Sequence, residues 1–332
     1  MNEEKYNFIG FGDIVIDTFI EIENAWIEDD NPESKKELCM SFGEKLPYKD
    51  TVVVKGTGNA ANASNAANKL GLKTAIISNV GGDDDADEII KDLSSRGINS
   101  ENIKKHPNTK TNHNYILRYN AERTILIHHN QYDYALPENM PKTDWMYLSS
   151  LAENSIPHHH EIAKYLSENP ETKLAFQPGT FQIKLGKEEL ADLYKVTEIF
   201  FCNKEEAQKI LETKQEDIKI LLKSIHDLGP KITVVTDGPE GAYAYDGEKY
   251  FRGTIYPDPA PPVDRTGAGD SFSATFTVAI VKGKTIQEAL SWGPINSMNV
   301  VQHVGAQAGH LTEEELLELL ANKPDSYFVE EI

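Results

Sequence analysis

The chain of 332 residues is poor in cysteine, has fewer basic than acidic residues and lacks any long apolar segment. Only Cys39 and Cys202 are present, without metal-ligand spacing, so we expect buried, reduced thiols rather than a disulfide or a metal site. The 33 Lys and Arg against 53 Asp and Glu give a net charge of −20, which opposes binding to nucleic acid or to an anionic membrane. No apolar run approaches the roughly 20 residues of a membrane helix, and the start MNEEKYN lacks a charged-then-apolar leader. We therefore expect a soluble, cytoplasmic protein.

Three common nucleotide-binding or kinase motifs are also missing. A dinucleotide fingerprint after the first expected strand would need a third glycine after Gly10 and Gly12, where Val15 stands. The Gly-Lys-Thr at Gly283–Thr285 has Val278 where a P-loop requires its first glycine. The His-Arg-Asp of protein kinases is absent. These absences disfavour an NAD-dependent enzyme, a P-loop NTPase and a protein kinase.

Three consecutive histidines, His158–His160, invite a zinc interpretation. No second ligand set follows at metal spacing, and Lys164 stands where a His-Glu-x-x-His motif would have its second histidine. We expect a surface run instead.

The order of apolar and polar segments predicts an α/β protein. Residues Tyr6–Ile16 have the pattern of a buried strand with Asp17 at its end, and the Ala-rich segment Asn59–Leu70 predicts a helix stopped by Gly71. Further strands are expected at 74–80, 145–148, 173–176, 199–202 and 232–236, a hairpin at 242–256, and helices at 84–96, 157–168, 187–195, 204–211, 217–227, 270–281, 285–301 and from Thr312 onward. Such alternation predicts a single domain, 1–332, with a doubly wound, mostly parallel sheet and helices on both faces.

Two segments without helical periodicity interrupt this pattern. Residues 18–55 and 108–134 carry short strand-like stretches, and together they predict a small β-sheet lid. Strand packing, a substrate cover and a dimer contact are all open for the tyrosines of the second segment, which are Tyr115, Tyr119, Tyr132 and Tyr134. A free lid edge would favour a homodimer.

The most informative segment is Asp264-Arg265-Thr266-Gly267-Ala268-Gly269-Asp270, which precedes an apolar, helix-compatible stretch. Small residues at 267–269 let successive backbone N–H groups converge, and a following helix adds its positive end. An anion hole of this kind stabilises the charge that spreads over a phosphoryl group in transfer. Asp270, directly after it, is a candidate general base. As an aspartate of ordinary pKa, about 4, it would be ionised at pH 7.

Other motifs accompany this segment in a fixed order. They are Gly12–Asp17, Thr57–Ser64 followed by Leu70-Gly71, Gly82–Asp84, Asn203–Glu206, Thr236–Gly241 and Gly305-Ala306. With them the chain resembles the ribokinase family of carbohydrate kinases, also called the PfkB family, over nearly its whole length. The departures are Val15 for the Asn of ribokinase itself, Thr57 for Gly, Ser64 for Ala and Arg265 for Thr.

The resemblance implies a role for each matching residue. Asp270 would be the catalytic base, and Gly267, Ala268 and Gly269 would form the anion hole. Substrate would be bound by Asp17, Gly58, Asn59 and Asn62, and ATP by Asn203, Glu206, Thr236, Gly238, Gly241 and Ala306. Glu206 would hold Mg²⁺ through water, and Asp264 could bind a monovalent cation such as K⁺.

The residues and the resemblance together predict a ribokinase-like kinase that uses ATP and Mg²⁺ to phosphorylate a hydroxyl of a small sugar or sugar derivative. A nucleoside kinase of the same family is the first alternative. The second is a sugar-binding sensor that keeps the fold without turnover, although the intact run Gly267–Asp270 disfavours it.

Overall fold

The computed structural model describes residues 5–29, 36–120 and 122–332. Within these ranges the largest element is a ten-stranded sheet in the order β16-β15-β14-β13-β12-β11-β10-β1-β6-β7. Its parallel part comprises β1 (Lys5–Phe11), β6 (Thr74–Gly81), β7 (Asn99–His106), β10 (Lys142–Leu148), β11 (Lys173–Phe176), β12 (Thr197–Asn203) and β13 (Ile232–Thr236). An antiparallel edge follows, made of β14 (Ala242–Tyr245), β15 (Tyr250–Gly253) and β16 (Val329–Glu331).

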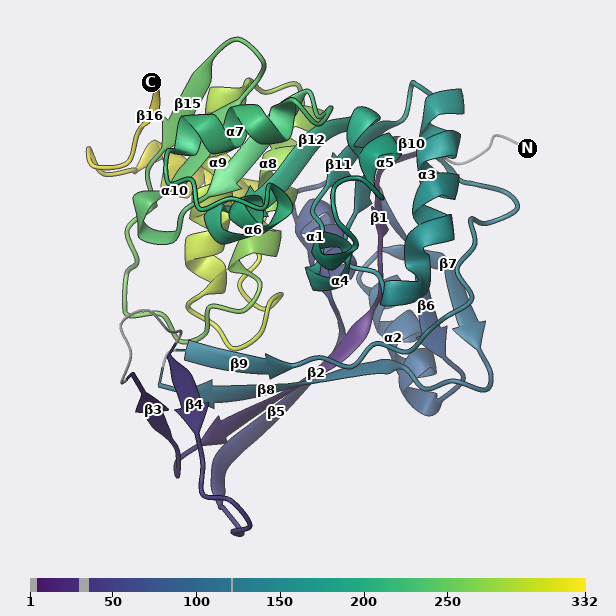
Figure 1. Cartoon of the computed structure of the whole chain (residues 1–332), viewed down its shortest axis with the longest axis vertical. Helices are drawn as coiled ribbons and strands as arrows, with labels where there is room; N and C mark the ends of the chain where they lie inside the picture. Colours follow the sequence, from purple (N-terminus) through teal and green to yellow (C-terminus); the bar gives the residue numbers. More distant parts are fainter. Residues whose placement is uncertain (1–4, 30–35, 121) are drawn as a thin grey trace.

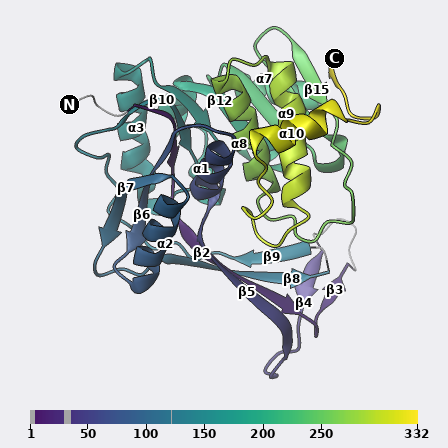
Figure 2. The same ribbon diagram turned by 180° about the vertical axis from the view of Figure 1, so that it is seen from behind.

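Helices cover both faces of this sheet. One face carries α3 (Ile156–Glu168), α4 (Thr180–Leu185), α5 (Ala191–Lys195), α6 (Lys204–Ile210) and α7 (Ile218–His226), which lie toward the viewer in Figure 1. The other carries α1 (Asn59–Lys69), α8 (Ala268–Val281), α9 (Ile286–Val300) and α10 (Glu313–Ala321), which lie in front in Figure 2 together with α2 (Asp84–Ser95). Alternate side chains of β1 point to the two faces, so that Phe8 joins the core under α1 and α8, and Ile9 the core under α3 and α7. The predicted doubly wound α/β fold is confirmed.

The lid is a separate four-stranded sheet in the order β5-β2-β8-β9. It consists of β2 (Val15–Ile22), β5 (Tyr48–Thr57), β8 (Asn112–Tyr119) and β9 (Glu122–Leu126), with a small hairpin of β3 (Trp26–Glu28) and β4 (Glu37–Cys39) beyond it. Figure 1 shows this sheet lying across one end of the α/β body, with the hairpin projecting away.

The expected first strand is wrong in one respect that matters for the site. The chain leaves the main sheet at Gly12, where the Ser78 hydroxyl donates to the Gly12 carbonyl at 2.6 Å and accepts from Ile14 N–H at 3.1 Å. A new strand, β2, then begins in the lid. Asp17 therefore lies inside the lid sheet, opposite Val54 and Asn114, and not at the end of the first strand.

Helix ends follow local sequence signals closely. Gly71 takes a φ of +86° after α1, as the predicted stop requires. The expected capping box of Thr312 and Glu315 opens α10, and a second one of Thr285 and Glu288 opens α9. The strands β7 and β16 and the helix α4 were not predicted, and the helix expected over 187–195 is confined to α5.

Two expectations about exposure are corrected. His158 and His159 are buried, and only His160 of the three is exposed. His159 bridges the Ser155 carbonyl and Gln182, and burial lowers its pKa to about 4. Both cysteines are free, but only Cys202 is buried, since Cys39 is partly exposed. No helix in the described ranges is long and apolar enough to cross a bilayer.

Candidate active site

A cavity of about 390 Å³ lies between the carboxyl ends of the main-sheet strands and the underside of the lid. Residues after β1, β10 and β11, the ends of β12 and β13, and the start of α8 line its floor. The lid contributes Asp17, Asn114, Ile116, Arg123 and Ile125. Ligands of open parallel sheets bind at this edge, so the topology itself marks the cavity as the place to look for chemistry.

Asp270, in the first turn of α8, is a buried carboxylate of the cavity with three amide donors. Its Oδ1 accepts from Asn59 Nδ2 at 2.7 Å and from Gln177 Nε2 at 3.1 Å, and its Oδ2 accepts from Asn62 Nδ2 at 2.8 Å. Burial raises the pKa of Asp270, and these three amides oppose the rise. The expectation of an ordinary pKa is therefore corrected, because a buried carboxylate is a stronger base than an exposed one.

The amides around Asp270 are themselves fixed in orientation. Asn62 accepts from Gln307 Nε2 at 2.9 Å through its oxygen, which turns its NH₂ group toward Asp270. Gln177 accepts from the Tyr147 hydroxyl, with the same result. Asn59 and Asn62 are predicted substrate ligands. Both line the cavity, but in this structure their NH₂ groups donate to Asp270.

The loop before α8 has the shape expected of an anion hole. Gly267 adopts a left-handed φ of +80°, and a Cβ there would lie 2.3 Å from the Ala306 side chain, so only glycine fits. Beside Gly269 a Cβ would meet only Gln177, at 3.9 Å. In the described part of the chain the N–H groups of Gly269 and Asp270 have no acceptor. A helix N-terminus with open N–H groups beside a cavity favours an anion.

Asp264 stabilises this loop through hydrogen bonds from Thr266 and Gly305. Its Oδ1 accepts from the Thr266 N–H at 3.0 Å and the Thr266 hydroxyl at 2.7 Å, and its Oδ2 accepts from the Gly305 N–H at 3.0 Å. Both oxygens are therefore engaged in holding the two glycine-containing segments together. The predicted monovalent cation at Asp264 stays a prediction.

Asp17 enters the cavity from the lid. Asn114, its neighbour on β8, donates to Oδ1 at 3.1 Å. Burial raises the pKa of Asp17 to about 6, and hydrogen bonds oppose the rise. A buried carboxylate with spare acceptor capacity suits a ligand that brings hydroxyl groups.

The position of Gly58 requires glycine because of its own backbone, and the predicted role of Gly58 in substrate binding stays a prediction. Its φ is +98°, and a Cβ would lie 2.6 Å from the carbonyl oxygen of Asp13. The close backbone approach at this point is thus to the loop between β1 and β2, although Gly58 also lines the cavity.

Asn203 and Glu206 lie at the end of β12 and in the first turn of α6. They form a capping box, with Glu206 N–H donating to Asn203 Oδ1 at 2.8 Å and Asn203 N–H donating to Glu206 Oε2 at 2.8 Å. Both also line the cavity, and burial raises the pKa of Glu206. A carboxylate here can face phosphates while it caps its helix.

A second, more apolar cavity of about 310 Å³ adjoins the first. Thr236, Arg265 and Gly269 line both cavities, so the two meet at the anion-hole loop. The walls of the second cavity include the predicted Gly238 and Gly241, with Ile255, Tyr256, Pro294, Met298 and Val301. Ala306, predicted beside the nucleotide, lines neither cavity and packs behind Gly267.

Several cavity residues were not predicted from the sequence. Gln177 and Arg123 are two of them. Gln177 follows β11 directly, so the rule that strand ends carry site residues could have found it. Arg123 lies on β9, and among the described residues its Nε has no hydrogen-bond partner. Its positive charge lowers the pKa of Asp270 and so favours the ionised carboxylate. No local signal distinguishes it from the neighbouring Arg118.

Comparison with known proteins gives a consistent result. The family model for pfkB family carbohydrate kinases matches residues 30–313. An uncharacterized sugar kinase of Archaeoglobus fulgidus is 25% identical over 73% of this chain and 96% of its own length. A nucleoside kinase of Methanothermobacter thermautotrophicus is 27% identical over 75% of this chain and 79% of its own.

Among solved structures, Arabidopsis thaliana ribokinase in complex with ribose and ATP superposes with a TM-score of 0.78. The match covers 96% of this chain and 99% of that one at 22% identity, and it shows that the two chains share a fold. The family model spans most of the chain and includes the anion-hole loop and Asp270. The chain belongs to the pfkB family of carbohydrate kinases, and it is a kinase with the ribokinase-like fold.

Proposed function

We propose that this enzyme transfers the γ-phosphoryl group of Mg-ATP to a hydroxyl of a small sugar or sugar derivative. The observation that carries the proposal is the position of Asp270. Its carboxylate lines the first cavity, which we call the acceptor cavity, and the preceding residue, Gly269, also lines the second, apolar cavity. An acceptor in the first cavity and a nucleotide in the second would meet at this point.

In this proposal Asp270 takes the proton of the attacking hydroxyl. Its raised pKa makes it a better base than an exposed aspartate, and the three amides keep it directed at the cavity. Asp17 would bind neighbouring hydroxyls of the acceptor and so orient the one that reacts.

The migrating phosphoryl group would be received by the N–H groups at the start of α8. Arg123 supplies positive charge from the lid, since no carboxylate among the described residues pairs with it. Mg²⁺ would be held near Glu206, through water, and would neutralise charge on the phosphates. The adenine would occupy the apolar cavity between Tyr256 and Met298.

The relatives support this assignment in two ways. The family model names carbohydrate kinases, and the A. thaliana neighbour was solved with ribose and ATP. The nucleoside kinase of M. thermautotrophicus keeps a nucleoside acceptor as the alternative. A cavity of about 390 Å³ with an apolar lid underside of Ile116, Ile125 and Ile127 could cover a base as well as a sugar ring.

A homodimer through the lid is part of the proposal. Val53, Tyr115 and Leu126 are between 46% and 53% exposed on the lid strands, which is unusual for apolar side chains unless a partner covers them. Light scattering coupled to size exclusion would give the mass in solution.

The test is ADP release from the full chain with Mg-ATP and a mixed panel of neutral sugars, sugar acids, sugar phosphates and nucleosides. Sugar-dependent release supports the proposal, and nucleoside-dependent release supports the alternative. If no acceptor stimulates release while sugars still protect the chain from thermal unfolding, the chain is a sensor and the proposed transfer is wrong. The same assay in K⁺ and in Na⁺ tests the cation prediction.

A further inference from the structure

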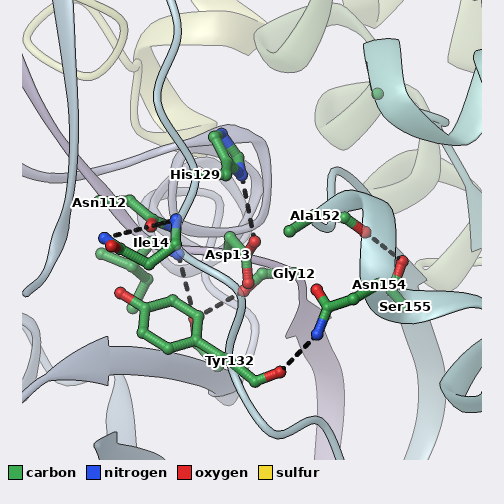
Figure 3. Close-up of polar contacts among 12 residues, drawn as sticks. Gly12, Asp13, Ile14, Asn112, His129, Tyr132, Ala152, Asn154 and Ser155 are labelled. Carbon is green, nitrogen blue, oxygen red and sulfur yellow. Dashed lines mark hydrogen bonds and ion pairs between the residues drawn. The ribbon is translucent and has the colours of Figure 1, made fainter. Parts of the chain in front are cut away.

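A buried carboxylate and an imidazole form a pair beside the acceptor cavity, and the proposed chemistry does not use either. Asp13 lies in the loop between β1 and β2, and its side chain is completely buried. Its Oδ2 accepts from the Tyr134 hydroxyl at 2.7 Å and from His129 Nδ1 at 3.1 Å. Figure 3 shows the imidazole above Asp13, with one ring nitrogen directed at the carboxylate.

This contact determines where the imidazole carries its proton. A carboxylate only accepts, so Nδ1 of His129 holds a hydrogen, and in the neutral ring Nε2 presents a lone pair. In the described residues Nε2 has no hydrogen-bond partner. His129 lines the acceptor cavity, and its side chain is 7% exposed. The pair thus leaves one acceptor nitrogen for a ligand in the cavity.

The surroundings hold the pair rigidly. The Asp13 N–H donates to the Ser150 carbonyl at 2.9 Å, and the Asp13 carbonyl is the group that demands glycine at position 58. The ring of Phe181 packs edge-on against the imidazole of His129, with 5.5 Å between the ring centroids. An imidazole held by Asp13 and Phe181 loses little conformational entropy when it binds a ligand, which is what a specificity residue requires.

Asp13 also bears a cost that a purely structural residue would avoid. Its second oxygen, Oδ1, is buried without a hydrogen-bond partner in the described part of the chain. An unsatisfied buried carboxylate oxygen destabilises the fold. The presence of aspartate at this position, despite this cost, is explained if the carboxylate is needed to orient His129.

We propose that His129 binds a hydroxyl of the acceptor other than the one that is phosphorylated, with Asp13 as its positioning residue. The inference rests on the proposed function and narrows it. Asp17 and Asp270 each engage hydroxyls, and His129 engages a further one. The acceptor is therefore a sugar with free hydroxyls along most of its length rather than a molecule with one reactive hydroxyl and an apolar remainder.

The first experiment compares His129→Phe with the parent on the sugar that the panel selects. The KM for the sugar should rise about tenfold or more, while the KM for ATP changes less than twofold. His160→Phe is the matched control, since that imidazole is exposed on α3 and contacts only Glu189 among described residues. A sugar KM within twofold of the parent, or an equal rise in both KM values, overturns the proposal.

A second measurement separates binding from positioning. Monodeoxy analogues of the sugar should include one that lacks the hydroxyl bound by His129. The parent should bind this analogue more weakly than the full sugar, whereas His129→Phe should bind the analogue and the full sugar equally well. In Asp13→Asn, nitrogen NMR of the labelled histidine should show the proton redistributed between Nδ1 and Nε2, which a packing defect alone would not cause. An unchanged tautomer in Asp13→Asn would contradict the positioning role.

Failure of the proposed function is distinguishable from failure of this inference. If no acceptor is phosphorylated, thermal protection by sugars without ATP still decides the role of His129. Protection that is lost in His129→Phe and kept in His160→Phe supports it. Protection equal in both variants, or absent with every sugar in the parent, overturns it.

Discussion

The floor of the active site and the lid above it are built on different physical terms. On the floor, Asp270 is buried and accepts hydrogen bonds from three side-chain amides. Two of these amides, those of Asn62 and Gln177, are oriented by hydrogen bonds from further residues. On the lid, Arg123 Nε has no hydrogen-bond partner among the residues that the structure describes, and the large apolar side chains of Tyr115 and Leu126 are exposed. A preassembled floor needs no reorganisation during reaction, whereas a lid with unsatisfied groups has contacts still to offer to a ligand or to a second protein surface.

The floor should therefore tolerate the least change, and the largest effect is expected at Asp270. Asp270→Asn keeps the shape of the side chain and removes the proposed base, so kcat should fall by about 10²–10⁴-fold. Acceptor-stimulated ADP release measures this, and Asp227→Asn, an exposed aspartate on the far end of α7, is the control. Turnover within threefold of the parent, with an unchanged melting temperature, would mean that another group takes the proton.

The lid offers the second largest effect. Arg123→Gln removes the cation that we propose to face the transferred group. The expected fall in kcat is about 10–100-fold, less than at Asp270, because the proposed Mg²⁺ and N–H groups remain. Arg252→Gln on β15, outside both cavities, is the matched control. A change in acceptor KM alone, at constant kcat, would show that Arg123 binds the acceptor and not the migrating phosphate.

Asp17 connects the two regions, since it belongs to the lid sheet but burial raises its pKa, as it raises that of Asp270 on the floor. Its pKa is about 6, above the ordinary 3.8, so the folded chain binds this proton more tightly than the unfolded chain does. Ionisation of Asp17 therefore costs folding free energy above pH 6; the cost develops between about pH 4 and pH 6 and is absent below. Asp17→Asn should stabilise the protein by about 1–3 kcal/mol at pH 7 and by close to nothing at pH 4.

The same substitution should damage function. If the ionised carboxylate accepts acceptor hydroxyls, kcat/KM of the parent falls as the pH drops through about 6, and Asp17→Asn loses this limb. Denaturant titrations at the two pH values and a pH–rate profile provide the measurements. A variant that is less stable than the parent at pH 7 would show that Asp17 is held by interactions stronger than its burial cost.

The smallest effect is expected where lid and floor touch at the surface. Arg265 lies 3.4 Å from Glu122 of β9, and both side chains are well exposed, 49% and 73%. Exposed ion pairs contribute roughly 0–1 kcal/mol, so Glu122→Gln should change kcat/KM by less than about threefold. A tenfold effect in steady-state kinetics would mean that this pair holds the lid closed.

Much of the floor could be predicted because its signals are local. The run Gly267–Asp270 carries its own turn, helix start and carboxylate, and the capping pair Asn203 and Glu206 sits within four residues. His129 has no such local signal, and Gln177 has only its position directly after β11. They reach the cavity only because β11 and the chain after β9 end at the same edge of the molecule.

The two clearest errors have the same origin. The sequence predicts Asp17 at the end of the first strand, because the break at Gly12 depends on hydrogen bonds of Ser78 to residues 64 and 66 positions away in the chain. The sequence predicts His158 and His159 at the surface, because the packing of His158 against Phe11 and Tyr134 and the hydrogen bond of His159 with Gln182 form only when distant segments come together. Contacts of long sequence separation decided both cases.

The most direct test of the account is a crystal structure of the full chain with acceptor, ADP, Mg²⁺ and a metal fluoride that mimics the transferred group. The account predicts one acceptor hydroxyl about 2.6–3.2 Å from the Asp270 carboxylate, with the fluorides on the N–H groups of Gly269 and Asp270. An acceptor hydroxyl held by a different base, with Asp270 still bound only to its three amides, would contradict it.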